Sequence, residues 1–71
     1  MMNVVVESCV TDNYLISIEI EVRYGNNYYK VQACPKRGDA MYGYPEREMA
    51  YQMNQKDKAY ATYRRYKKKY I

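Results

Sequence analysis

Apolar and polar residues alternate most clearly along residues 15–23. The even positions from 16 to 22 are isoleucine or valine, and the odd positions from 17 to 23 are serine, glutamate or arginine. Successive side chains of a strand point to opposite faces of a sheet, so this pattern predicts a strand with one buried and one wet face. A second alternating run covers 28–34, and Gly25-Asn26-Asn27 between the runs tolerates positive φ. We therefore expect a β-hairpin over 15–34.

The segments that flank this hairpin extend the predicted sheet. Val4-Val5-Val6 is β-branched and predicts an earlier strand, and Thr11-Asp12-Asn13 supplies the turn that follows it. Pro35 has no amide hydrogen for a sheet ladder, so we expect the third strand to end there. The following stretch, 36–45, contains two glycines and mixed charge and predicts a surface loop.

Residues 46–53 fit two structures. Pro45 followed by acidic residues is typical of a helix start. Alternation of Met49, Tyr51 and Met53 instead favours a strand that pairs back onto the hairpin. The cap residues Asn54 and Asp57 would begin a new helix after such a strand, which favours the extended alternative.

The chain from about Lys56 to Tyr70 has the period of an α-helix. At about 100° per residue, four alanine and tyrosine residues fall in one narrow stripe along the helix, and this stripe should pack on the sheet. The stripe consists of Ala59, Tyr63, Tyr66 and Tyr70. Tyr60 lies on the flank of this stripe, where we expect it to be half exposed.

These elements together predict a single α+β domain over residues 1–71. A small antiparallel sheet of three or four strands should pack against one C-terminal helix. The expected core comprises Ile16, Ile18, Ile20, Val22, Tyr29, Val31, Ala33, Ala59, Tyr63 and Tyr66. A domain of 71 residues has only a thin core and often gains stability from a partner subunit, so a homodimer is one expectation.

Charge is distributed unevenly along the chain. From Lys56 onward there are seven basic residues and one acid, a net charge of +6, whereas residues 1–55 carry five basic and seven acidic residues, a net charge of −2. A basic segment attracts phosphate backbones, anionic lipid or an acidic protein surface. Its cations can neutralise phosphates while a tyrosine stacks on a base, or they can simply form the solvated face of the last helix. The residues expected to contact nucleic acid or an acidic partner are Tyr60, Arg64, Arg65, Lys67 and Lys68.

The aromatic content supports a second hypothesis. The chain has eleven tyrosines, no phenylalanine and no tryptophan, and tyrosine is enriched at protein interfaces because it joins contact area to a polar tip. A protein-docking patch is expected from Tyr28, Met41, Tyr42 and Tyr44. Such a chain would act as a protein interaction factor, for example an accessory or inhibitor protein of a mobile element.

Residues that carry common enzymatic chemistry are missing. Without histidine there is no Ser-His or Cys-His pair, and the three glycines match no phosphate-binding loop. Cys9 and Cys34 complete no common zinc site and are expected to be reduced thiols. We therefore expect no catalytic residue, no metal and no cofactor.

Targeting signals are not apparent either. No stretch has the pattern of a secretory signal, and none approaches the roughly 20 apolar residues that span a bilayer. These features predict a cytoplasmic protein without a membrane span. The sequence as a whole predicts a small non-enzymatic binding or accessory protein, with nucleic acid as the first candidate partner.

Overall fold

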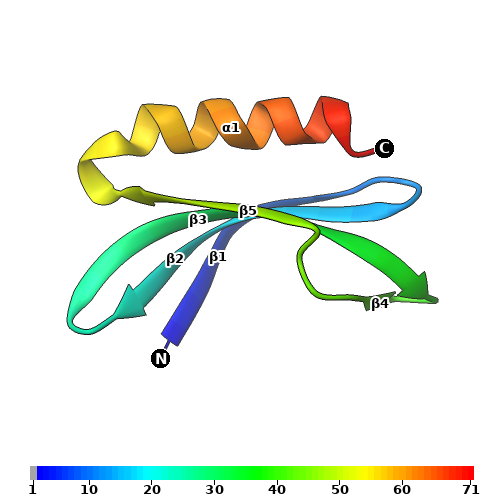
Figure 1. Ribbon diagram of the computed structural model, residues 1–71, viewed down its shortest axis with the longest axis horizontal. Helices are drawn as coiled ribbons and strands as arrows, with labels where there is room; N and C mark the ends of the chain where they lie inside the picture. Colours follow the sequence, from blue (N-terminus) through cyan, green and yellow to red (C-terminus); the bar gives the residue numbers. More distant parts are fainter. Residues whose placement is uncertain (1) are drawn as a thin grey trace.

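An antiparallel meander forms the first half of the computed structural model, which describes residues 2–71 (Figure 1). Strands β1 (Met2–Val10), β2 (Tyr14–Arg23) and β3 (Asn26–Gly38) pair with one another in sequence order. The predicted strand at residues 4–6 is thus part of a longer one. Thr11 closes the first turn, because its amide donates to the Tyr14 carbonyl over 2.8 Å and its hydroxyl accepts the Tyr14 amide over 3.0 Å.

The second half of the chain completes the sheet and covers one of its faces. Two strands pair with the side of β3 that is remote from β2, namely β4 (Met41–Tyr42) and β5 (Arg47–Gln52). A short 3-10 turn, η1 (Met53–Gln55), leads into helix α1 (Lys56–Lys69), which lies along the sheet. The predicted α+β architecture, an antiparallel sheet with one C-terminal helix, is confirmed.

The hairpin turn between β2 and β3 is tighter than the sequence suggested. Tyr24 and Gly25 alone form the loop, with φ angles of 53° and 77°. Two successive positive φ angles are typical of a type I′ turn, whose twist matches that of the flanking strands. Asn26 and Asn27 therefore belong to β3 and pair with Arg23 and Val22.

Pro35 does not end the third strand, contrary to the prediction. It pairs with Tyr14 inside β3, and the Lys36 amide beyond it donates to the Asn13 carbonyl over 2.8 Å. The nitrogen of Pro35 faces the other side of β3, where pairing changes from β5 to β4. A missing amide hydrogen costs little at such a break between partner strands. The expected loop at 36–45 accordingly contains the end of β3 and the short strand β4.

Residues 47–52 form a strand, which decides between the two structures that the sequence allowed. β5 runs antiparallel to β3, with Tyr51 opposite Tyr29 and Met49 opposite Val31. The helix then begins at Lys56, as predicted, although Gln55 rather than Asn54 or Asp57 precedes its first turn.

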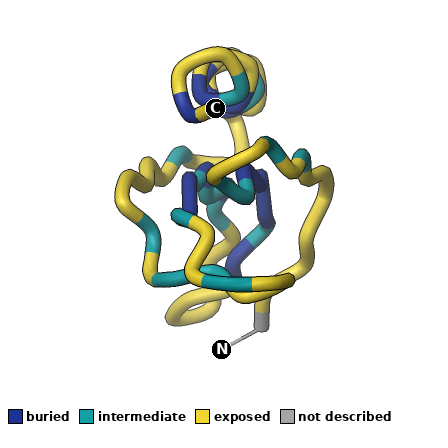
Figure 2. The backbone as a smooth tube through the Cα atoms, turned by 90° about the vertical axis from the view of Figure 1, so that its right-hand side faces the viewer, coloured by how far each residue is buried: buried dark blue, intermediate teal, exposed yellow. Residues whose placement is uncertain are grey.

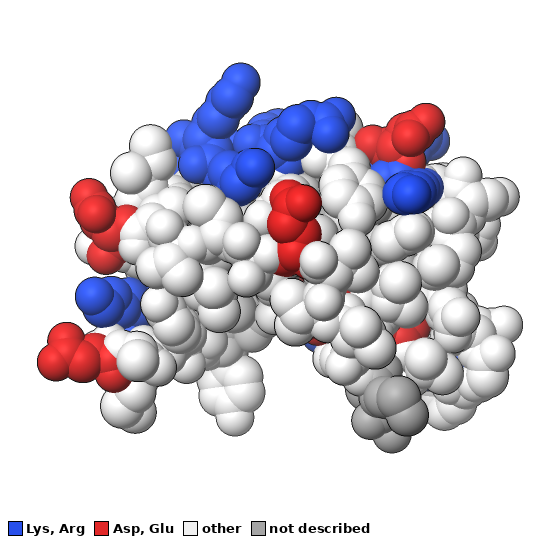
Figure 3. Space-filling view, turned by 180° about the vertical axis from the view of Figure 1, so that it is seen from behind, with Lys and Arg blue, Asp and Glu red and all other residues white. Residues whose placement is uncertain are grey.

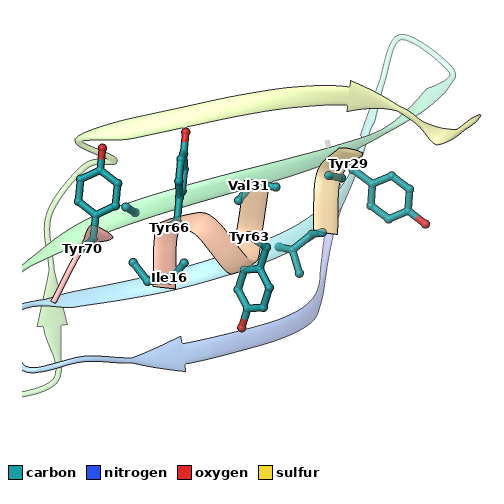
Figure 4. Close-up of a cluster of buried hydrophobic side chains, with 9 residues drawn as sticks. Ile16, Tyr29, Val31, Tyr63, Tyr66 and Tyr70 are labelled. Atoms are coloured by element: carbon teal, nitrogen blue, oxygen red, sulfur yellow. The ribbon is translucent and has the colours of Figure 1, made fainter. Parts of the chain in front are cut away.

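The core lies between α1 and the facing side of the sheet (Figure 4). The helix contributes the predicted stripe, all of it buried, and Tyr66 and Tyr70 pack edge to face with ring centroids 5.3 Å apart. The buried core residues are Ile16, Ile18, Tyr29, Val31, Ala33, Ala59, Tyr63, Tyr66 and Tyr70. Ile20 is only partly buried, and Val22, which was expected in the core, is 37% exposed because it lies in the hairpin beyond the region that α1 covers.

The opposite face of the sheet is less exposed than the alternating pattern predicted. Ser17, Glu19 and Glu21 are buried, although they were expected to face water. β2 lies between β1 and β3, and side chains of both neighbours contact its carboxylates. The β2–β3 hairpin and β4 bend away from α1 (Figures 1 and 2). Glu19 accepts hydrogen bonds from Asn3 Nδ2 at 3.2 Å and from Gln32 Nε2 at 3.1 Å. Burial of the two carboxylates is tolerated because each accepts hydrogen bonds or forms ion pairs with neighbouring side chains, whereas the buried Ser17 hydroxyl has no hydrogen-bond partner among the described residues.

Candidate functional site

The outward surface of α1 carries the strongest concentration of one charge. Arg64, Arg65 and Lys68 are exposed, and Lys67 is half buried. Figure 3 shows lysine and arginine side chains gathered along the side of the molecule that α1 forms. The structure therefore brings the four predicted cations of the contact site together on one element, with a shallow depression between their side chains over Ala61.

The cations on this surface are not neutralised within the protein. Both ion pairs found among residues 2–71 involve Glu21, which contacts Arg23 and lies 3.1 Å from Lys30 Nζ, and neither pair includes a residue of α1. Asp57, in the first turn, is the acid of this helix. The positive potential of α1 is consequently directed to solvent, where it attracts anions.

Three lysines of α1 instead lie over tyrosine rings. Lys67 Nζ is 4.8 Å from the centroid of Tyr63, and Lys69 Nζ is 5.4 Å from that of Tyr70. Such contacts hold the aliphatic part of each lysine against the edge of the core. They do not neutralise the ammonium charge, because a tyrosine ring is uncharged and attracts the cation only through its quadrupole. Lys58, Arg64, Arg65 and Lys68 make neither such a contact nor an ion pair within the described chain, and Lys69 is exposed despite its ring contact, so these cations can engage a partner.

Tyr60 lies beside the basic surface but is not an open stacking platform. Its ring packs edge to face against Tyr29, with centroids 6.2 Å apart, and Lys56 Nζ lies 5.9 Å from the ring centre. The other tyrosines of α1 are buried against the sheet. The tyrosines that alternate with cations in the sequence thus belong mainly to the core.

The four residues expected to form a docking patch occupy opposite ends of the sheet. Met41, Tyr42 and Tyr44 lie in or beside β4, where Met41 is 66% exposed and Tyr44 is 93% exposed. Tyr28 lies near the start of β3, whereas β4 pairs with its end at Lys36 and Gly38, roughly 25 Å away along the strand. The structure brings the three β4 residues together and leaves Tyr28 apart.

A polar hollow on the sheet face opposite α1 was missed by the sequence reasoning. It has a volume of about 360 Å³, and its floor includes Glu21, whose hydrogen bond from Lys30 holds the pKa of the carboxyl below its usual value. The residues around the hollow are Glu21, Arg23, Tyr28, Lys30, Glu48, Met49 and Ala50. The sequence contained an indication of this hollow, because Glu21 and Lys30 carry opposite charges and lie on the same face of the two predicted hairpin strands.

The two cysteines are free thiols on opposite faces of the sheet. Cys9 pairs with Ile16 on the helix side, and Cys34 pairs with Leu15 on the other side. Their strands flank β2, so their Cα atoms are roughly 10 Å apart, beyond the reach of about 7 Å for a disulfide. Burial raises the pKa of the Cys34 thiol, which disfavours its reactive thiolate form.

Within residues 2–71, no cluster of three or more histidine, cysteine, aspartate or glutamate side chains is arranged to hold a metal ion. No helix in the same range has the length and apolar character needed to cross a membrane. No protein-family model matches the sequence, and no curated protein or solved structure is significantly similar to it. Function therefore has to be inferred from the geometry of the residues themselves.

Proposed function

We propose that this chain is a non-enzymatic binding protein that contacts the phosphate backbone of nucleic acid through the outward surface of α1. The observation that carries the proposal is the set of unpaired, exposed cations at Arg64, Arg65 and Lys68. Lysine and arginine that neutralise phosphates release condensed counterions, which drives association. The absence of histidine from the chain supports the non-enzymatic part of the proposal.

The charge pattern of α1 differs from that of a helix surface that only confers solubility. Solubilising surfaces mix lysine, arginine, glutamate and aspartate. Here the last acid is Asp57, and the chain from Lys58 to Ile71 contains no glutamate or aspartate. Mutual repulsion among these cations is unfavourable for the isolated protein, and an anionic partner relieves it.

Neutralising the four predicted cations tests the proposal. Arg64, Arg65, Lys67 and Lys68 change together to glutamine, and binding to a fluorescent duplex is measured by anisotropy at several salt concentrations. We expect weaker binding to all sequences alike, and a log-affinity against log-salt slope that is flatter by about 0.9 for each phosphate that is no longer neutralised. An unchanged slope with intact folding would show that α1 is not the contact surface.

A matched control is available outside α1. Arg23, Lys36, Arg37 and Arg47 are also exposed basic residues, and changing them to glutamine removes the same charge from the sheet. If net charge alone determined binding, the two quadruple variants would lose equal affinity. The proposal requires that the α1 variant loses much more.

The exposed β4 segment favours protein docking as a second candidate function. Met41 and Tyr44 present large apolar surfaces at the tip of the sheet, remote from the cations of α1. Under this candidate, Tyr42→Ala and Tyr44→Ala would impair partner capture without changing the melting temperature. Self-association, the simplest form of such docking, would appear as a concentration-dependent sedimentation coefficient.

We also propose that the protein resides in a reducing compartment such as the cytoplasm. Both thiols are free, and their positions on opposite faces exclude an intramolecular disulfide without unfolding of the sheet. Disulfides are rare in reducing compartments. Thiol titration of freshly prepared protein should give two reactive groups after denaturation.

A further inference from the structure

The cations of α1 form two rows along its outward surface. Residues spaced by three, four or seven positions share one side of a helix. One row contains Lys58, Arg65 and Lys69, and the other contains Arg64 and Lys68, with Asp57 at the N-terminal end of this second row. All five cations are exposed. Because Arg64 and Arg65 are adjacent in sequence, the rows diverge by about 100° around the helix axis.

Ala61 lies on the crest between the two rows. It is exposed, and it falls one turn before Arg64 and Arg65. The cationic side chains rise around its small methyl group and enclose the shallow depression described above. The outward surface of α1 therefore has a low crest with charged side chains on both flanks.

We propose that α1 lies in the major groove of double-stranded DNA, with one row of cations on the phosphates of each strand. This inference rests on the proposed function and names its substrate class. A helix with side chains is about 10–12 Å wide, and the major groove of B-form DNA is about 12 Å wide and 8.5 Å deep. Two phosphate backbones border that groove, one for each row of cations. Single-stranded nucleic acid offers only one backbone and would leave the second row without phosphates.

The shape of the molecule permits this placement. Viewed along the sheet, α1 stands as a ridge above the strands, which curve away from it (Figure 2). Its 14 residues extend about 21 Å, enough to place cations from both ends of the helix against the groove walls. A single strand would be bound chiefly by base stacking, and Tyr60 is already packed between Tyr29 and Lys56.

Separate neutralisation of the two rows tests the groove placement. One variant carries Lys58→Gln, Arg65→Gln and Lys69→Gln, and the other carries Arg64→Gln and Lys68→Gln. On duplex DNA we expect the salt slope to flatten by about 2.7 for the first variant and about 1.8 for the second. If only one row changes the slope, the helix contacts a single backbone and the groove placement is wrong, whereas the proposed function stands.

Duplex RNA of the same sequence provides an independent test. The major groove of A-form RNA is deep and narrow, and side chains cannot read it. We expect tighter binding to duplex DNA than to duplex RNA or to either single strand at equal salt. Equal affinity for the two duplexes would overturn the groove placement, and failure to bind any of them would overturn the proposed function as well.

A charge placed on the crest completes the experiment. Ala61→Glu puts a carboxylate toward the groove floor and walls, and Ala50→Glu adds the same charge at an exposed position of β5. We expect at least a tenfold loss of duplex DNA affinity for Ala61→Glu and a much smaller loss for Ala50→Glu. Equal effects of the two variants would contradict the placement of α1 in the groove, and circular dichroism checks that both variants fold.

Discussion

The hydroxyl oxygen of Tyr51 lies 2.5 Å from Oγ1 of Thr62, and this hydrogen bond joins β5 to α1. Thr62 is buried and Tyr51 is partly buried. The contact satisfies the tyrosine hydroxyl at this one position of a protein that has tyrosine but no phenylalanine. It also links the strand whose structure the sequence left open to the helix that covers the sheet.

Removing one hydroxyl of this pair should lower the free energy of unfolding more than removing both hydroxyls. Tyr51→Phe leaves the buried Thr62 hydroxyl without its partner, with an expected loss of about 1–3 kcal/mol in the free energy of unfolding. Adding Thr62→Val should recover most of that loss, because both polar groups are then gone. Urea denaturation of the four proteins of this cycle gives the coupling energy, and additive losses would contradict the structural role of the bond.

Ile18 is the most direct test of the sheet register. It is fully buried beneath α1, so Ile18→Ala should reduce the free energy of unfolding by about 2–5 kcal/mol. Val10→Ala is the control. Val10 is 63% exposed, so its substitution should reduce the free energy of unfolding by less than about 0.5 kcal/mol. Similar denaturation midpoints for the two variants would indicate a different register.

The hairpin, the helix and most of the core could be predicted because each depends on local periodicity. Period two placed Ile16, Ile18, Val31 and Ala33 on the buried face, and helical spacing placed Tyr63 and its neighbours opposite them. The predictions that were wrong depend on contacts between segments distant in sequence. Pro35 is tolerated within β3 because two different strands pair with that side of β3, which no local pattern reveals.

Burial of Ser17, Glu19 and Glu21 also escaped prediction, because alternation alone assigns polar residues to solvent. Curvature of the sheet and coverage by the neighbouring strands became visible only in three dimensions. For the candidate site, the cations of α1 could be located from the distribution of charge along the sequence and from the helical period. The sequence could not show that Tyr60 is packed against Tyr29, or that Tyr28 lies far from β4.

Glu21 should make stability sensitive to acid. Its carboxyl pKa is lowered chiefly by the hydrogen bond from Lys30, so the folded state holds the charged form more strongly than the unfolded state does. The resulting stabilisation is present above the unfolded pKa of about 4.3 and is lost as the pH falls through the lower folded value. Thermal melts of wild type and Glu21→Gln should therefore differ less at pH about 2 than at pH about 6. A constant difference would contradict this role of Glu21.

Tyr63 should limit stability at alkaline pH. Burial raises its pKa to about 12, whereas the unfolded value is about 10. The folded state therefore keeps a proton that the unfolded state loses, so stability is fully present below pH about 10 and declines as the pH rises toward 12. Tyr63→Phe should weaken this decline, as measured by denaturant unfolding across that range. An identical alkaline decline in the variant would show that Tyr63 does not cause it.

A backbone amide NMR titration with a short DNA duplex at low salt tests the central claim most directly, because it locates the contact surface on the wild-type protein. We expect the largest chemical-shift changes along the outward surface of α1, around Ala61, Arg64, Arg65 and Lys68, and their reversal when salt is added. Changes confined to residues 41–44, or no changes at any protein concentration, would contradict nucleic-acid binding through α1.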